Sequence, residues 1–247
     1  MNIGGYQKIT LMDYPGKVAA ICFVQGCQLR CPYCHNPDLV LTERFITEKE
    51  CKNITKDFFS YLRKRRGMLD GIVFSGGEPL LQNDIQEVLY HLKIEGFSIK
   101  LDTNGLLPDR LESLIDNGLL DYVALDYKNN SLGWSKAAGI ESTMKNQYLK
   151  WIKSLEILDN YFIPYELRTT VVKEIHSIED LILMGKELKN LIKKSSPKWF
   201  LQTFEKNHDI LCDYQNNNTI LSPYSKEEMM VIKEILHQLI PEVELRS

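Results

Sequence analysis

The chain has 247 residues, enough for one large α/β domain, and 44% of them are hydrophobic, as in a globular protein that buries a substantial core. The 30 Lys and Arg residues and the 33 Asp and Glu residues give a net charge of −3. This near-balance excludes a strong general attraction to nucleic acid or anionic lipid, so we expect no nucleic acid among the partners.

The sequence shows no signal for export or for membrane insertion. Residues 1–6 lack the basic region and apolar stretch of a signal peptide. No run of about 18 apolar residues is present to span a bilayer. These features predict a cytoplasmic protein with no membrane partner.

Short, continuously apolar segments follow one another along most of the chain. Such segments are typical of strands that are buried on both faces of a parallel sheet. The predicted strands cover residues 18–24, 71–75, 98–102, 122–126, 166–172 and 199–203.

Between these strands, apolar residues recur at helical spacing. Ser177 with Asp180, and Ser225 with Glu228, have the spacing of a capping oxygen and an acidic residue in the first helical turn. The second pair predicts a C-terminal helix over about residues 225–239. The other apolar faces are formed by Ile85, Val88, Leu89 and Leu92, by Leu111, Leu114 and Ile115, and by Ile152, Leu155 and Leu158.

This alternation of strands and helices predicts right-handed βαβ units and an α/β fold with a parallel sheet. A flat doubly wound sheet and a curved, incomplete barrel both fit the pattern. No internal repeat and no linker rich in Pro or Gly divides the chain. We therefore expect a single domain over residues 1–247, with its core at about residues 17–204.

Three of the six cysteines lie within eight positions of one another. Cys27, Cys31 and Cys34 follow the first predicted strand, and ligands of α/β folds gather at loops beyond the carboxyl ends of parallel strands. Each of these thiolates can bind one iron of a cubane cluster, which normally has four thiolate ligands. The fourth iron would then accept a ligand from outside the protein.

A zinc site and a disulfide framework are the other interpretations of the cysteines. Zinc accepts thiolate and imidazole ligands, so His35 could complete a site with the same cysteines. However, His35 directly follows Cys34, and neighbouring side chains seldom converge on one ion. A disulfide framework would spread its cysteines through a smaller secreted chain. An iron–sulfur site is therefore favoured, and a non-catalytic zinc or iron–sulfur structural protein is the alternative of another class.

The cysteine loop, with Tyr33 before its last cysteine, resembles the signature of the radical S-adenosylmethionine (SAM) superfamily. The wider stretch from DYPG at residues 13–16 to CHNPD at residues 34–38 is similar to the glycyl-radical activating enzymes of that superfamily. The resemblance covers about residues 6–204. It implies a partial (β/α)6 barrel with outer helices, a 4Fe–4S cluster on the three cysteines, and SAM bound at the open iron.

The resemblance also assigns a cofactor role to the turn after the second predicted strand. Gly76, Gly77 and Glu78 would hold the methionine amino group of SAM. Two glycines allow the backbone to approach a ligand closely, and the carboxylate of Glu78 can accept hydrogen bonds from an ammonium group. Without the resemblance, the same residues would be interpreted as a plain tight turn.

Polar residues end the third and fourth predicted strands. In pyruvate formate-lyase activating enzyme, the residues that match Asp102, Thr103 and Asp126 surround a monovalent cation beside the methionine carboxylate. Lys128 matches a lysine near the substrate and cofactor. The structural alternative is capping of a helix or formation of a turn, for which Asp and Thr are common.

The last two predicted strands carry the remaining candidates. Arg168 would be costly inside a barrel unless it is paired with a carboxylate. The resemblance implies that Arg168 contacts the carboxylate or ribose region of SAM. The alternative is a structural ion pair with Glu166, on the same face of the strand. By the same resemblance, Gln202 and the backbone of Tyr33 would face the adenosine.

The resemblance implies an oxidoreductase that cleaves SAM reductively and generates a glycyl radical on a partner enzyme. No acid–base residue is needed, and we identify none. Residues 6–16 and 23–27 are most similar to activators of anaerobic ribonucleoside-triphosphate reductase. Activation of pyruvate formate-lyase or another glycyl-radical enzyme is the alternative. An electron donor such as flavodoxin or ferredoxin would be a second partner.

Overall fold

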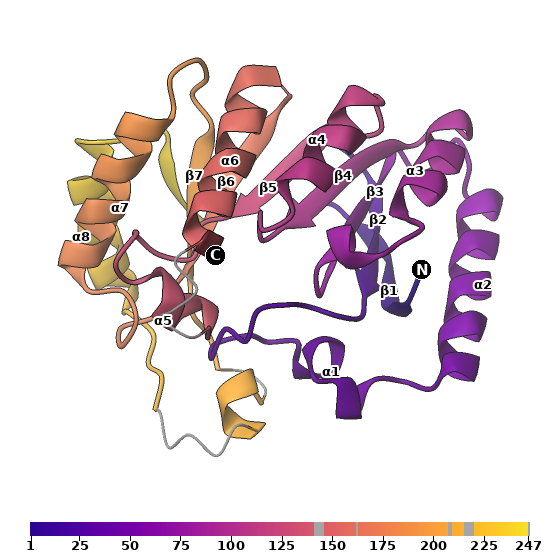
Figure 1. Ribbon diagram of the computed structural model, residues 1–247, viewed down its shortest axis with the longest axis horizontal. Coiled ribbons are helices and arrows are strands. Elements are labelled where there is room, and N and C mark those ends of the chain that lie inside the picture. Colours follow the sequence, from indigo (N-terminus) through magenta and orange to yellow (C-terminus); the bar gives the residue numbers. More distant parts are fainter. Residues whose placement is uncertain (141–145, 162, 207–208, 215–219, 247) are drawn as a thin grey trace. The chain divides into compact units, whose positions relative to one another are not determined.

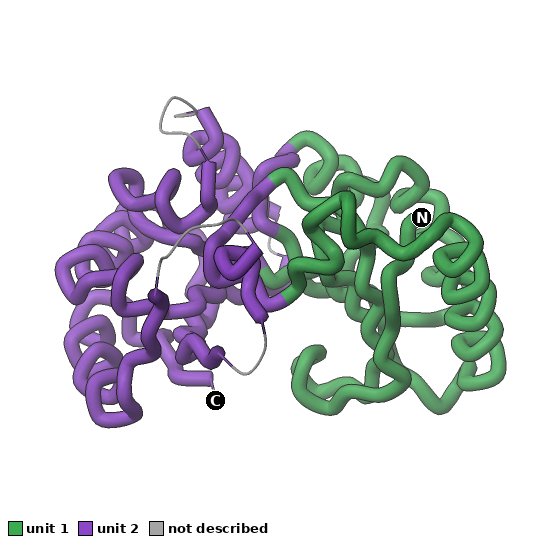
Figure 2. Tube along the Cα trace, turned by 90° about the horizontal axis from the view of Figure 1, so that it is seen from below, with its two compact units in different colours: residues 1–28, 36–103, 109–124 green, residues 29–35, 104–108, 125–247 purple. Residues whose placement is uncertain are grey.

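The computed structural model describes residues 1–140, 146–161, 163–206, 209–214 and 220–246. These residues form two compact units (Figure 2). Unit 1 contains residues 1–28, 36–103 and 109–124, and unit 2 contains residues 29–35, 104–108 and 125–247. The chain passes between the units several times, so the units are interleaved in sequence.

The strands of the sheet follow one another in chain order, from β1 to β8. Figure 1 labels β1 to β7. Strand β1 is antiparallel to β2, whereas the pairs β2–β3, β3–β4, β6–β7 and β7–β8 are parallel. A doubly wound sheet reverses its strand order at a switch point, whereas a barrel keeps the chain order. The order therefore decides for the barrel type over the flat sheet. The strands are β1 Ile3–Thr10, β2 Ala19–Val24, β3 Gly71–Gly76, β4 Ser98–Thr103, β5 Tyr122–Asp126, β6 Tyr165–Val171, β7 Lys198–Thr203 and β8 Val243–Arg246.

All six predicted strands are present, and their ends differ from the prediction by at most one residue. Two further strands were not predicted. Strand β1 contains two glycines and alternates weakly, and β8 has only four residues, so neither has a clear apolar signal. Both are positioned by pairing with a predicted neighbour, β2 or β7.

In unit 1, helix α2 (Glu48–Lys64) packs on β1. The ring of Tyr6 lies 5.2 Å from that of Phe58, and the hydroxyl of Tyr61 donates to the carbonyl of Lys8 at 3.0 Å. The basic run at residues 63–66 coincides with the end of this helix. The other helical segments that begin or lie in this unit are α1 Pro37–Val40, η1 Thr42–Arg44, η2 Pro79–Leu81, α3 Ile85–Ile94 and, from residue 109, α4 Pro108–Asp116.

Unit 2 is built around an aromatic core. The ring of Tyr127, directly after β5, stacks on that of Trp151 with centroids 4.3 Å apart, and Trp134 and Trp199 also pack against Tyr127. The capping boxes predicted at Ser177 and Ser225 are both present. The helical segments are α5 Trp134–Ala138, α6 Asn146–Tyr161, α7 Ile178–Leu191, η3 Leu211–Tyr214 and α8 Lys226–His237.

None of the described helices combines the length and the hydropathy needed to cross a bilayer.

The buried carboxylate of Asp159 connects α6 to the segment after α7. It accepts hydrogen bonds from the backbone N–H groups of Lys193, Lys194 and Ser195 at 2.8–3.2 Å, and from the hydroxyl of Ser195 at 2.5 Å. Burial acts to raise the pKa of Asp159, but these hydrogen bonds outweigh it and hold the pKa below its usual value. The carboxylate therefore stabilises the folded state in its charged form.

We predict that Asp159→Ala lowers the free energy of unfolding at pH 7 by about 2 kcal/mol, as expected for hydrogen bonds to a charged group. Because the folded-state pKa is lowered, this difference should be present above the ordinary pKa of 3.8 and should disappear as the pH falls through the lowered value. Urea denaturation measures both effects. Asp57→Ala, at an exposed position of α2, is the control and should change stability little; equal losses in the two variants would contradict the prediction.

Candidate active site

In unit 1, the glycine turn after β3 is hydrogen-bonded to the start of the cysteine loop. The N–H of Gly77 donates to the carbonyl of Val24 at 2.8 Å, and the N–H of Glu78 donates to the carbonyl of Gly26 at 2.7 Å. The N–H of Gly26 in turn donates to the carbonyl of Leu39 at 2.8 Å. The residue before Cys27 is therefore held by two segments that are distant in sequence.

This contact leaves no room for a side chain on either glycine. A Cβ atom on Gly77 would lie 2.1 Å from the carbonyl oxygen of Gly26, and a Cβ atom on Gly76 would lie 2.7 Å from the backbone nitrogen of Val24. Gly76 also has a φ of +104°, which side-chain-bearing residues rarely adopt. The two glycines are thus required by the close approach of two backbone segments.

Glu78 places a fully buried carboxylate at this turn. It accepts hydrogen bonds from the N–H of Leu80 at 3.0 Å and from the hydroxyl of Thr103 at 2.8 Å. Thr103 ends β4, so the structure brings together two of the residues that the sequence singled out. A buried carboxylate is costly without such partners.

Asp102 is also nearly buried and has a cationic partner in the chain. The ammonium group of Lys100 lies 3.0 Å from its carboxylate, and Lys100 has no exposed surface. Residues 100 and 102 lie on the same face of β4 because side chains alternate along a strand. Lys100 was missed by sequence reasoning, although its spacing of two from Asp102 was a usable signal.

In unit 2, the end of helix α5 supports the second half of the cysteine loop. The N–H of Arg30 donates to the carbonyl of Ala138 at 3.0 Å. Gly139 follows with a φ of +63°, and a Cβ atom there would lie 1.8 Å from the carbonyl oxygen of Arg30. Helix α5 therefore ends in a glycine that allows the loop to pass closely.

The short helix η3 supports the same loop from another part of the chain. The N–H of Leu211 donates to the carbonyl of Cys34 at 3.0 Å, and the N–H of Cys212 donates to the carbonyl of Pro32 at 3.1 Å. Within the loop, the N–H of Cys34 donates to the carbonyl of Cys31 at 3.0 Å. Cys212, to which the sequence assigned no role, thus contributes its backbone to the shape of the loop.

Cys31 is buried beside a lysine. Burial raises the pKa of its thiol to about 11, and the ammonium group of Lys128 acts in the opposite direction. Burial also acts to lower the pKa of Lys128, but the charges of Asp126 and Cys31 raise it well above its usual value. Lys128 therefore stays charged and favours the thiolate of Cys31, which is the form that binds iron.

The carboxylate of Asp126, at the end of β5, binds two cations. Its Oδ2 accepts from the Nζ of Lys128 at 3.0 Å, and its Oδ1 accepts from the Nη2 of Arg168 at 3.0 Å. Arg168 therefore has the carboxylate partner that the sequence required, while Glu166, considered as an alternative partner, accepts from Arg246 at 3.4 Å. Asp126 thus holds the two cationic side chains close together.

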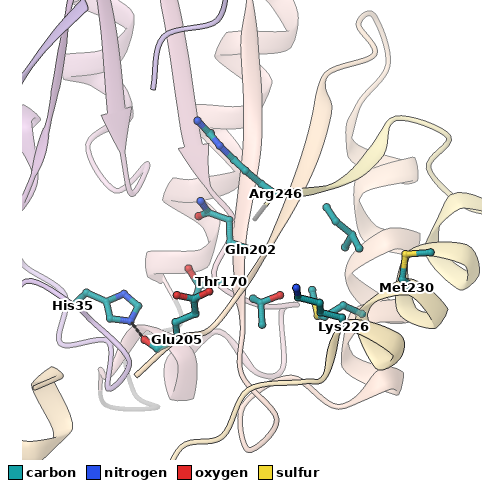
Figure 3. Close-up of a pocket in the computed structure, with 10 residues that line it drawn as sticks. His35, Thr170, Gln202, Glu205, Lys226, Met230 and Arg246 are labelled. Atoms are coloured by element: carbon teal, nitrogen blue, oxygen red, sulfur yellow. Dashed lines mark hydrogen bonds between the residues drawn. The ribbon is translucent and has the colours of Figure 1, made fainter. Parts of the chain in front are cut away.

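Gln202 lines a cavity of about 660 Å³ in unit 2 (Figure 3). Thr170, Gln202 and Arg246 are register partners on β6, β7 and β8, so they line it from one level of the sheet. His35, next to Cys34, also lines it; its ring stacks on Phe204 and its Nε2 lies 2.6 Å from the carbonyl oxygen of Glu205.

The donor chemistry fits an iron–sulfur cluster. All six cysteines are free of disulfide bonds. Among the residues that the structure describes, no three His, Cys, Asp or Glu side chains converge as ligands of a single metal ion. A cubane makes a different demand, because each thiolate binds a different iron.

Residues 21–173 match the Radical SAM superfamily. A protein of Methanocaldococcus jannaschii named as a glycyl-radical enzyme activating enzyme is 36% identical over 193 residues, which are 76% of this chain and 75% of that protein. The pyruvate formate-lyase-activating enzyme of Clostridium pasteurianum is 26% identical over 243 residues, 97% of this chain and 98% of that protein. A radical SAM methyltransferase from Sphaerobacter thermophilus shares the fold, with a TM-score of 0.66 and 18% identity, over 95% of this chain and 67% of that one.

The chain belongs to the radical SAM superfamily, since the match covers more than half of its residues. Within that superfamily it is an activating enzyme of glycyl-radical enzymes. Its cofactors are accordingly a 4Fe–4S cluster and SAM, and its substrate is a glycyl-radical enzyme. The shared fold agrees with the partial barrel that the sequence resemblance implied.

We predict that Gly77→Ala destabilises unit 1, because the added Cβ atom meets the backbone of Gly26, which cannot move aside as a side chain can. The free energy of unfolding should fall by more than about 2 kcal/mol, in the range of overpacking changes. Denaturant unfolding and the iron content after anaerobic reconstitution should both decrease.

Gly5→Ala is the matched control. Gly5 lies on β1 of the same unit, and a Cβ atom there would meet nothing within 4 Å. This variant should keep the stability and iron content of the wild type. Equal behaviour of the two variants would show that the close approach at Gly77 does not support the loop.

Proposed function

We propose that the chain activates anaerobic ribonucleoside-triphosphate reductase by generating a glycyl radical on it. The observation that carries the cofactor part of this proposal is the contact of Gly77 and Glu78 with the start of the cysteine loop. It gives a buried carboxylate a fixed position relative to the residue before Cys27. The similarity of residues 6–16 and 23–27 to activators of this reductase supports the choice of partner.

We assign the three cysteines, Cys27, Cys31 and Cys34, as ligands of the 4Fe–4S cluster. Three thiolates would leave one iron of the cluster available to SAM. When bound, the cluster and SAM would supply the one-electron chemistry that cleaves SAM to methionine and a 5′-deoxyadenosyl radical, and that radical would abstract hydrogen from a glycine of the partner. The residues of the chain bind, orient and exclude water, and none acts as an acid or base.

Different charged residues bind the ammonium group and the carboxylate group of SAM. Glu78, beside Gly76 and Gly77, accepts hydrogen bonds from the ammonium group. Arg168 and Lys128, the two cations that bind Asp126, attract the carboxylate group. Gln202 and the backbone of Tyr33 face the adenosine.

Asp102 and Thr103 keep their proposed place near the methionine moiety. The resemblance gives Asp102 a monovalent cation as its neighbour. In this chain Lys100 already places a fixed positive charge at 3.0 Å from that carboxylate. We propose that Lys100 serves in this position and that an added cation is not required.

The remaining parts of the proposal concern the setting of the reaction. A small protein such as flavodoxin or ferredoxin supplies the electron, and the enzyme works in the cytoplasm, where thiols stay reduced. Residues 1–247 act as one radical SAM domain, because the chain passes repeatedly between the two compact units.

Pyruvate formate-lyase is the second candidate partner. The relative from Clostridium pasteurianum, which matches nearly the whole chain, is an activating enzyme of pyruvate formate-lyase by name. An identity of 26% supports a shared family more strongly than a shared partner enzyme.

The assignment of the cluster predicts a clear effect of removing one ligand. Cys31→Ala should lose the brown colour, the iron and the production of 5′-deoxyadenosine after anaerobic reconstitution. We expect a decrease of more than about 100-fold, since even groups that only support metal ligands cost up to that factor. Cys51→Ala, at a buried cysteine on α2, is the control and should keep the cluster. Normal turnover by Cys31→Ala would refute the assignment.

The partner is identified by incubation with each candidate enzyme, SAM and a reductant. Electron paramagnetic resonance should detect a glycine-centred radical on the anaerobic reductase and none on pyruvate formate-lyase. A variant of the reductase whose radical-bearing glycine is replaced by alanine is the control. A signal on pyruvate formate-lyase alone would select the second candidate.

A further inference from the structure

A buried histidine of unit 2, which no sequence pattern identified, is hydrogen-bonded to the backbone of Lys128. His176 follows β6 and has no exposed surface. The backbone N–H of Val172 donates to its Nδ1 at 3.1 Å, and its Nε2 lies 2.7 Å from the carbonyl oxygen of Lys128. Both ring nitrogens are therefore in hydrogen bonds to backbone.

These two partners determine the tautomer of the ring. A backbone N–H can only donate, so Nδ1 of His176 accepts and carries no proton. A carbonyl oxygen can only accept, so Nε2 carries the proton and donates it to Lys128. The ring is thus neutral, and burial lowers the pKa of His176 in agreement with this state.

Lys128 lies two residues after the end of β5, and its carbonyl is hydrogen-bonded to His176. The backbone of Tyr127 is still bound to β6, because its N–H donates to the carbonyl of Arg168 at 2.8 Å and its carbonyl accepts from the hydroxyl of Thr169 at 2.7 Å. Lys128 is the next residue, and its carbonyl is bound by His176. The histidine therefore holds the residue that directly follows Tyr127.

The same histidine contacts the cysteine loop. Its ring lies edge-on to that of Tyr33, with centroids 6.2 Å apart. Tyr33 lies between Cys31 and Cys34 in the sequence. The carbonyl of His176 itself accepts from the hydroxyl of Tyr224 at 2.8 Å. The backbone of His176 is therefore held by Tyr224 and by Val172, to whose carbonyl its N–H donates at 2.8 Å, while its ring contacts two parts of the site.

We propose that His176 is a positioning residue for SAM: it fixes Lys128, and through the shared carboxylate of Asp126 also Arg168, in the orientation that receives the carboxylate group of the cofactor. This inference rests on the proposed function, which gives Lys128 and Arg168 that role. The ammonium of Lys128 and the guanidinium of Arg168 both bind Asp126 at 3.0 Å, so a displacement of Lys128 is transmitted to Arg168.

Two amide variants separate this role from a merely structural one. In His176→Asn, the short side chain keeps an acceptor near the position of Nδ1 for Val172 and loses the donor to Lys128. In His176→Gln, the longer side chain keeps the donor to Lys128 and loses the acceptor for Val172. Each variant loses one hydrogen bond, so we expect similar melting temperatures for the two.

We expect His176→Asn to raise the KM and the dissociation constant for SAM about tenfold, the lower end of the cost of removing a group that orients a ligand. The kcat and the iron content should change little. His176→Gln should restore SAM binding to nearly that of the wild type. Equal SAM binding by the two variants would overturn the proposal.

A second measurement does not depend on the loaded enzyme. Nitrogen-15 nuclear magnetic resonance of histidine-labelled protein should show His176 with its proton on Nε2. A proton on Nδ1 would overturn the inference even if SAM is cleaved. The predicted tautomer together with a wild type that does not cleave SAM would instead refute the proposed function.

Discussion

The geometry of the cysteine loop is set by backbone hydrogen bonds to segments that lie far away in the sequence. The loop has no regular secondary structure, so its buried N–H and carbonyl groups need partners elsewhere. In unit 1, Gly26 is bound by Leu39 and Glu78. In unit 2, residues 30–34 are bound by the end of α5 and by η3. Cluster binding would depend on these anchors as much as on the thiols, because a ligand loop that moves cannot hold three irons in place.

Buried charged residues of both units have partners within the chain. In unit 1, Glu78 accepts hydrogen bonds from Leu80 and Thr103, and Asp102 is paired with Lys100. In unit 2, Asp126 is shared by Lys128 and Arg168. This pairing limits the cost of burying the charges.

The family is established by similarity to known proteins, whereas the glycyl-radical partner depends on surface residues. Cofactor binding needs a few residues at the ends of strands, and these are readable as motifs. Recognition of a large partner enzyme uses surface residues from many elements, which have no fixed spacing. This is why the cofactors follow from the family, whereas the glycyl-radical partner has to be identified by a radical signal.

The six central strands, the capping boxes and the cysteine motif could be predicted from the amino-acid sequence. Each of these is local, since continuous apolar runs, the spacing of Ser from Asp or Glu three residues later, and cysteine spacing are visible within a few residues. The tertiary structure decided the rest: the strand order of the sheet, β1 and β8, the pairing of Arg168 with Asp126, and the places of Lys100 and His176. His176 lies 48 residues from Lys128, and a single buried histidine has no periodicity. His176 meets Lys128 because β6 lies next to β5 in the sheet. No local sequence pattern predicts this neighbour.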